Sequence, residues 1–173
     1  QYLMMLDIDE FLVSTDPMKK VIDVILSIDK NQTPDHSETK AIRVQRYNFG
    51  SNGHMTKPPG NVVDNYTMHE TVCSSYKTIA NTDFLDLSKR FFGVHDFPLT
   101  DRPGKIWNPY LNYAKGYPGG CEPHNVNEVP LVINHYYTKS YQEYLNRCKL
   151  WKDGGINHYG YRKDCVKKFD KEN

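Results

Sequence analysis

"YLMMLDIDEFL", residues 2–12, is an apolar run that leads directly into three acidic residues. The run predicts a buried strand over residues 2–8, and Asp7 and Asp9 would share one side of it because side chains alternate along a strand. Carboxylates this close repel each other and lose hydration on burial. A hard divalent cation would relieve that repulsion, since it accepts carboxylate oxygens. The stretch therefore indicates either a metal site or a solvated strand end with ordinary acids.

The composition suits one globular domain. The chain has 173 residues, of which 38% are apolar and 25% charged, enough for a sizeable core. A net charge of +1 does not indicate nucleic-acid binding, because nucleic-acid-binding proteins usually have a clustered excess of basic residues. No stretch approaches the ~20 apolar residues of a membrane-spanning helix. We interpret residues 1–173 as one domain from a longer protein, with residues 150–173 as a helical or frayed tail.

Hydrophobic periodicity along the chain predicts alternating strands and helices, and hence an α/β fold. Asp16 is a candidate N-cap for a helix that starts at Pro17 and ends near Ile28. Ser140 and Glu143 have capping-box spacing before a second helix. Further strands are expected at 41–49, 62–67, 76–80 and 131–137, a short helix at 82–92, and an irregular segment at 98–130.

The four cysteines do not form a CxxC pair, which argues against a thiolate zinc site. Their spacing leaves open whether they are free thiols or disulfides. Asn31 and Asn65 each begin an Asn-x-Thr triplet, a glycosylation pattern that is short and often matches by chance.

A second group of polar residues lies in "INHYYTKSYQEYL", residues 133–145. His135 falls within a predicted strand, where a histidine is often a hydrogen-bonded core residue. An imidazole is also a good ligand for a manganese-type ion. Lys139, beside the start of the next helix, could meet a phosphate there.

Three stretches in this order, "LDIDEFL" (6–12), "YNFGSNGH" (47–54) and "INHYYTKSYQEYL", resemble glycosyltransferase family 92 (domain of unknown function 23) and its glycosyltransferase-2-like relatives. The resemblance spans roughly residues 2–148. It implies a GT-A-like mixed sheet with flanking helices, here the C-terminal part of the catalytic domain without its nucleotide-binding N-terminal half.

The resemblance also implies roles for individual residues. Asp7 and Asp9 match the metal-holding D-x-D, and His135 matches the histidine that completes the shell of a divalent cation, for which the resemblance implies Mn²⁺. The expected substrate-binding residues are four residues of a loop placed near the acceptor and two lysines. They are Phe49, Gly50, Gly53 and His54 of the loop, with Lys77 and Lys139.

The general base of the expected reaction is not fixed by the sequence. Four residues are candidates for taking the acceptor proton: Asp96, His95, Glu70 and Glu10. Asp96 and His95 precede the irregular segment and are slightly favoured. Glu10 could instead orient a metal ligand or bind the acceptor.

The expected function is metal-dependent, inverting transfer of a sugar from a nucleoside-diphosphate donor to a glycan acceptor. UDP-galactose is the donor that the resemblance suggests. Eukaryotic relatives lie in the Golgi lumen behind an N-terminal membrane anchor, and bacterial ones in the cytoplasm.

A second reading is an inactive glycan binder, with stacking platforms at Tyr47, Phe49, Trp107, Tyr110 and Tyr113. A third is a haloacid-dehalogenase-like phosphatase. Those enzymes have a D-x-D-x-T/V motif, and Phe11 at its fifth position argues against this reading.

Overall fold

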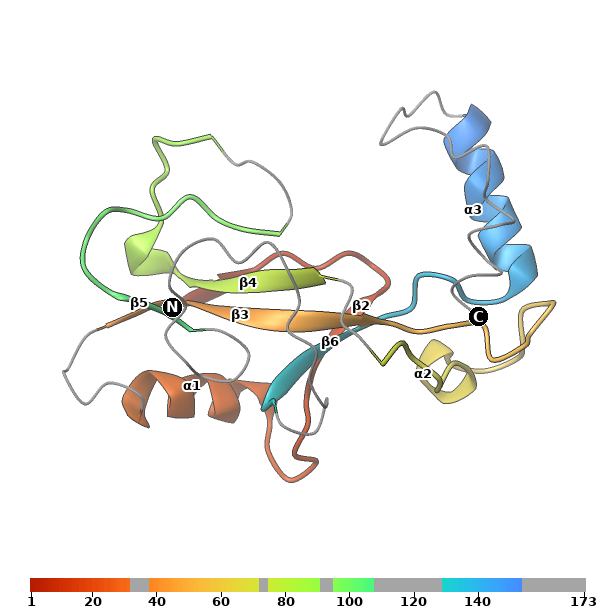
Figure 1. Ribbon diagram of the computed structural model, residues 1–173, viewed down its shortest axis with the longest axis horizontal. Helices are drawn as coiled ribbons and strands as arrows, with labels where there is room; N and C mark the ends of the chain where they lie inside the picture. Colours follow the sequence, from red (N-terminus) through yellow and green to blue (C-terminus); the bar gives the residue numbers. More distant parts are fainter. Residues whose placement is uncertain (32–37, 72–74, 91–94, 108–128, 154–173) are drawn as a thin grey trace. The chain divides into compact units, whose positions relative to one another are not determined.

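The computed structural model describes residues 1–31, 38–71, 75–90, 95–107 and 129–153. These residues form an α/β structure with a mixed sheet and few helices (Figure 1). The elements in chain order are β1 (Tyr2–Met4), β2 (Glu10–Ser14), α1 (Val21–Asn31), β3 (Thr39–Asn48), α2 (Val62–Asn65), β4 (Ser75–Asn81), a 3₁₀ helix (Thr82–Phe84), β5 (Lys105–Trp107), β6 (Leu131–His135) and α3 (Tyr141–Asp153). The α/β class expected from the sequence is confirmed.

The chain divides into two compact units, 1–47 with 71–134 and 48–70 with 135–173. The sheet has the order β1-β4-β3-β6-β2, with β5 paired to β3. β3 and β4 are antiparallel, from Ala41 opposite Ala80 to Arg46 opposite Ser75, whereas β3 and β5 are parallel. Asn48 and His135, the last residues of β3 and β6, are the first residues of their segments in the second unit.

The core of the first unit lies between α1 and one face of β3 and β4 (Figure 1). Val24, Ile25 and Ile28 of the helix pack with Ile42 and Val44 of β3 in one buried cluster. Because side chains alternate along a strand, this face continues from Val44 to Arg46. The apolar row on the core face therefore ends in a cation.

The second unit has its own aromatic core of Phe49, Tyr66 and Tyr136, all buried. The rings of Phe49 and Tyr136 are 4.7 Å apart between centroids. Both come from residues just past the ends of β3 and β6, and the Phe49 amide donates to the His135 carbonyl at 2.8 Å. This cluster orders the segments that carry the loop at 49–54 and the start of α3.

The first strand is shorter than the predicted 2–8, because β1 ends at Met4. β1 pairs with β4 only as far as Met4 opposite Ile79. At the next position of β4, the Thr78 amide donates to the His95 carbonyl at 3.0 Å. A distant segment thus takes the edge of β4 that a longer β1 would need.

Residues 62–67 were expected to be a strand, and this prediction is wrong, because Val62–Asn65 form the short helix α2. The amide group of the Asn65 side chain donates to the carbonyls of Pro59 and Asn61, at 2.8 and 2.9 Å. Such local side-chain to backbone bonds compete with strand pairing, and here they outweigh the β-propensity of the two valines.

The helix expected from Pro17 begins later, at Val21. The Asp16 carboxylate instead accepts from the Met18 amide at 3.0 Å, within a turn before the helix. The short helix expected at 82–92 is a single 3₁₀ turn, Thr82–Phe84, and its N-cap is Asn81.

The strands at 41–49, 76–80 and 131–137 are confirmed within a few residues at their ends. The capping box is confirmed as well, since the Glu143 amide donates to Ser140 Oγ at 3.3 Å and the Ser140 amide to Glu143 Oε2 at 3.3 Å. β5 lies inside the segment that was expected to be irregular, and much of that segment, with the tail from 154, lies outside the described residues. Among the helices described, none is long and apolar enough to cross a membrane.

Candidate functional site: an acidic turn on a buried ion cluster

Asp7 and Asp9 lie in a tight turn between β1 and β2, and Glu10 is the first residue of β2. The Glu10 amide donates to the Asp7 carbonyl at 3.0 Å, and the Asp7 amide donates to Glu10 Oε2 at 2.9 Å. Ile8, at the tip, is fully exposed. Asp7 and Asp9 therefore flank the tip of a closed turn, and they do not share one side of a strand as the sequence predicted.

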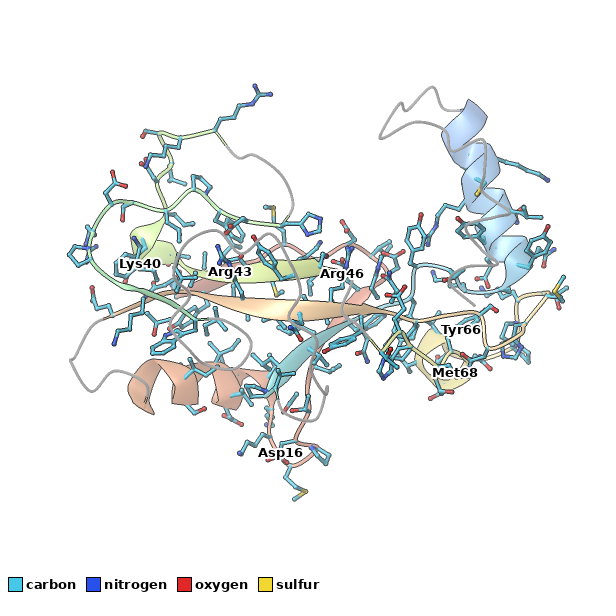
Figure 2. All side chains as sticks on the ribbon, in the orientation of Figure 1. Asp16, Lys40, Arg43, Arg46, Tyr66 and Met68 are labelled. Carbon is cyan, nitrogen blue, oxygen red and sulfur yellow. The ribbon has the colours of Figure 1, made fainter. Side chains whose placement is uncertain are left out.

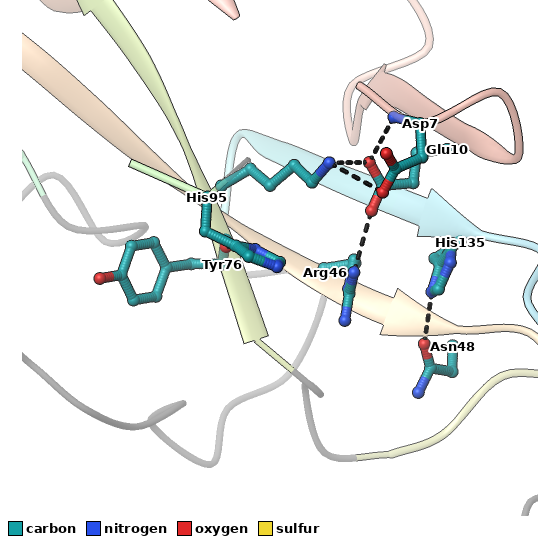
Figure 3. Close-up of polar contacts among 8 residues, drawn as sticks. Asp7, Glu10, Arg46, Asn48, Tyr76, His95 and His135 are labelled. Carbon is teal, nitrogen blue, oxygen red and sulfur yellow. Dashed lines mark hydrogen bonds and ion pairs between the residues drawn. The ribbon is translucent and has the colours of Figure 1, made fainter. Parts of the chain in front are cut away.

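Glu10 is the residue that anchors this turn to the sheet (Figure 3). Its Oε1 lies 3.0 Å from Arg46 Nη1, and its Oε2 lies 2.5 Å from Lys77 Nζ. The Glu10 side chain has no exposed surface and that of Lys77 is 1% exposed. Both cations come from the core-facing side of β3 and β4, where Lys77 stands opposite Val44, so Glu10 closes the end of the apolar row.

The surroundings of Glu10 keep it ionised. Burial alone would raise the pKa of the Glu10 carboxyl. Hydrogen bonds from Lys77, from the Asp7 amide and from Arg46, together with the charge of Lys77, outweigh burial and lower that pKa below its ordinary value of 4.5. A carboxylate held in this way neither reaches solvent nor releases its partners easily, because removing one member of a buried ion pair leaves an uncompensated charge.

Asp7 occupies a different position in the same cluster. Its Oδ2 lies 3.1 Å from Lys77 Nζ, yet its side chain is 50% exposed. The cluster has no net charge, because the two carboxylates of Asp7 and Glu10 balance the two cations of Arg46 and Lys77. Asp7 is the exposed member, so it can exchange partners at the lowest cost, while Lys77 keeps Glu10.

His95 and Asp96, the favoured candidates for the general base, belong to the other side of the strand pair. Asp96 Oδ2 lies 3.6 Å from Nη2 of the buried Arg43, and Arg43 stacks over the Tyr76 ring at 5.0 Å. Arg43 and Arg46 are three residues apart on β3 (Figure 2), so their side chains leave opposite faces of the sheet.

The His95 ring is exposed, and its Nδ1 lies 3.0 Å from the Tyr76 carbonyl oxygen (Figure 3). This contact holds the ring at the edge of β4. Asp96 therefore lies on the opposite face of the β3–β4 pair from Glu10, and the three residues stay separate candidates for the base.

His135 is in the second unit, whereas Asp7 and Asp9 are in the first, so a shell made of all three stays a prediction. Nδ1 of His135 lies 2.7 Å from Asn48 Oδ1 (Figure 3). With the amide oxygen as acceptor, Nδ1 carries the proton and the ring's lone pair is on Nε2. A hydrogen bond of this kind orients histidines that ligate metals, and it equally satisfies a buried structural histidine.

The loop predicted to face the acceptor has a clear structural task. The His54 amide donates to the Ser51 carbonyl at 3.0 Å, and the residues between them, Asn52 and Gly53, have φ of 51° and 78°. Two successive left-handed residues are the requirement of a type I′ turn, which Asn-Gly meets best. Gly53 is thus needed for the turn itself.

This turn delivers backbone carbonyls to the start of α3. The Tyr141 and Gln142 amides donate to the carbonyls of His54 and Met55, both at 3.0 Å. Ser140 Oγ accepts a hydrogen bond from the Glu143 amide. The amides that a phosphate would use at this helix N-terminus are thus already occupied. Lys139 precedes the cap with φ of 54°, and a phosphate contact by Lys139 would have to rest on its ammonium group.

Aromatic residues proposed as glycan platforms are mostly buried. Tyr47, Phe49 and Trp107 are 2%, 8% and 4% exposed. Stacking on a sugar requires an open ring face, so these three side chains serve the core. Tyr110 and Tyr113 lie outside the described residues.

The carboxylate oxygens of Asp7 and Asp9 in the acidic turn are of the kind that ligate a hard divalent cation. Such an ion takes oxygen ligands and often uses only one or two carboxylates, with substrate phosphates and water completing its shell. Asp7 and Asp9 offer carboxylates at the surface of a turn that is fixed from below by Glu10. Within the described residues, no group of three or more His, Cys, Asp or Glu side chains is already arranged to hold a metal ion.

Sequence reasoning missed the importance of Arg46 and the partners of Lys77. A signal was present in the pattern of β3, where a cation follows Ile42 and Val44 at the spacing of core positions. A buried cation at such a position requires an acid. The identity of that acid, 36 residues away, could not be read from the strand.

Comparison with protein families, with curated proteins and with solved structures finds no match to this chain.

Proposed function

We propose that this chain carries the metal-binding part of a GT-A-type, inverting glycosyltransferase that moves galactose from a UDP carrier to a glycan hydroxyl. The observation that carries the proposal is the acidic turn. Its backbone is fixed by buried contacts of Glu10, while the Asp7 carboxylate remains half exposed. The order of the three sequence stretches that resemble glycosyltransferase family 92 supports the same conclusion.

In this proposal Asp7 and Asp9 hold the divalent cation, and His135 completes its shell. The cation, Mn²⁺ by preference, would offset the negative charge that grows on the departing diphosphate. The task of Glu10, Lys77 and Arg46 is to keep the turn closed, so that both aspartates are in position before the donor arrives. Preorganisation of this kind lowers the cost of binding.

Glu10 is poorly suited to be the general base. A base must come within hydrogen-bond reach of the acceptor hydroxyl, and the Glu10 side chain has no exposed surface and is bound by two cations. We therefore assign Glu10 a positioning role. His95, whose ring is exposed, Asp96 and Glu70 stay the candidates for the base.

The disulfide at Cys148 bears on the compartment. Cys148 is disulfide-bonded, and the other three cysteines lie outside the described residues. Disulfides persist in oxidising compartments and are rare in the cytosol. This supports a lumenal, secretory-pathway location such as the Golgi over a cytoplasmic one.

The test is manganese-dependent turnover of UDP-galactose by the full-length protein, with Asp9→Asn as the variant. We expect its activity to fall on the order of a hundredfold or more with the thermal unfolding temperature unchanged. Asp101→Asn is the matched control, because Asp101 is an exposed acid of the same unit. Normal turnover by folded Asp9→Asn protein would refute the metal assignment. Wild-type protein with neither metal-linked donor binding nor hydrolysis would indicate the inactive glycan binder.

A further inference from the structure

Lys77 is a buried lysine shared between two acids of unequal exposure. Its Nζ contacts Glu10 Oε2 at 2.5 Å and Asp7 Oδ2 at 3.1 Å. The Glu10 side chain is fully buried and that of Asp7 is 50% exposed. The Lys77–Glu10 pair is therefore the fixed part of the cluster, and the Lys77–Asp7 contact is its exchangeable part.

We propose that Lys77 holds the Asp7 carboxylate in the metal-free protein and that a divalent cation at the acidic turn displaces it. The inference rests on the proposed function, because it takes Asp7 and Asp9 as the ligands. It adds a role that metal ligation alone does not give, namely that a lysine of the protein competes with the ion for one of its ligands.

The exchange is physically feasible because no buried charge is left unpaired. When Asp7 turns to the ion, Lys77 keeps Glu10, and Glu10 also keeps Arg46 and the Asp7 amide. Removing the only partner of a buried charge is costly, but here each buried charge retains a partner. The backbone of the turn stays fixed while one exposed carboxylate changes partners.

The competition should set the affinity for the ion. An ion pair with one exposed partner contributes modestly, so loss of the Lys77 charge should strengthen metal binding by a small factor. Glu10→Gln should act in the opposite direction, because Lys77 then has Asp7 as its only carboxylate partner within the cluster and holds it more strongly. Two variants of one cluster are thus expected to shift the affinity with opposite signs.

The experiment is titration of the full-length protein with manganese(II) chloride alone, followed by electron paramagnetic resonance of the free ion, without nucleotide. We expect Lys77→Met to bind Mn²⁺ about two- to fivefold more tightly than the wild type and Glu10→Gln to bind it more weakly. Lys89→Met is the charge-matched control, since Lys89 is an exposed lysine outside the cluster, and it should bind like the wild type.

The outcomes separate the two proposals. Wild-type binding that is lost in Asp9→Asn, with no shift in folded Lys77→Met or Glu10→Gln, would overturn the exchange and leave the metal site standing. Wild-type protein that binds no Mn²⁺ at the turn would overturn both. If Lys77→Met does not fold, Lys77→Gln takes its place, because its amide can still donate to Glu10 while the charge that holds Asp7 is removed. Unchanged Mn²⁺ affinity in folded Lys77→Gln would overturn the exchange.

Discussion

The ammonium group of Lys77 lies 2.5 Å from Glu10 Oε2, and both side chains are buried at the end of the apolar core. This pair joins the turn that carries Asp7 and Asp9 to the central strands of the sheet. The turn depends on the sheet for its conformation, because Glu10 also accepts the Asp7 amide at 2.9 Å. Stability of the first unit and geometry of the candidate site are therefore linked through Glu10.

Glu10→Gln should destabilise the protein by about 3 to 5 kcal/mol, since Lys77 and Arg46 both lose the buried carboxylate that they share. Equilibrium unfolding in urea measures this loss. Combining it with Lys77→Met should cost less than the sum of the two single changes, because the double variant no longer leaves Lys77 without its buried acid. A loss below about 0.5 kcal/mol, the range of ordinary surface changes, would contradict the anchoring role.

Ser140→Ala should lower stability by about 1 kcal/mol, because Ser140 Oγ accepts the Glu143 amide at the start of α3. Asp16→Ala is the comparison. Asp16 accepts the Met18 amide in an exposed turn before α1 begins, and its loss should cost less than about 0.5 kcal/mol. Urea unfolding of both variants gives the ranking, and equal costs would show that Asp16 acts as a helix cap after all.

Tyr66→Phe should cost about 1 kcal/mol at neutral pH, since the buried Tyr66 hydroxyl donates to Glu143 Oε2 at 2.9 Å. Burial and the bond to Glu143 raise the pKa of Tyr66 from 10.0 to about 12. The folded state thus favours the neutral phenol, and its contribution is complete below pH 10 and is lost as the pH rises towards 12. The stability difference between wild type and Tyr66→Phe should shrink over that window, and a constant difference would contradict it.

Glu143 should show the opposite pH dependence. Burial would raise the pKa of the Glu143 carboxyl, but hydrogen bonds from Ser140 and Tyr66 outweigh it and lower that pKa below 4.5. The folded state favours the carboxylate, so its contribution is present above pH 4.5 and is lost as the pH falls through the lowered value. Urea unfolding of wild type and Glu143→Gln between pH 7 and acid pH should converge in acid, and curves that stay apart would exclude this linkage.

Cys148 should resist alkylation by iodoacetamide until a reductant is added, because it is disulfide-bonded. Peptide mapping by mass spectrometry should find its peptide cross-linked before reduction and single afterwards. Reduction should lower stability by about 2 to 4 kcal/mol. Alkylation of Cys148 in folded, unreduced protein would remove the support for an oxidising compartment.

Local chemistry decided several elements that the sequence predicted correctly. β3 and β4 follow from β-branched and aromatic residues at strand spacing, and the start of α3 follows from Ser140 and Glu143. The failure at α2 is also local, since Asn65 bonds to the carbonyls of Pro59 and Asn61. Propensity alone gave no weight to those bonds, although all three residues stand within seven positions.

The sequence by itself determined which residues are acidic, apolar or cap-forming, and hence the α/β class and the concentration of carboxylates after the first apolar run. Only the tertiary structure decided that β1 ends at Met4, that Asp7 and Asp9 lie on a turn, and that Glu10 is buried between Lys77 and Arg46. The physical reason is separation along the chain, because the partners of the turn stand 36 and 70 residues away. Charge pairing across such distances is set by which strands become neighbours, and no local pattern encodes that choice.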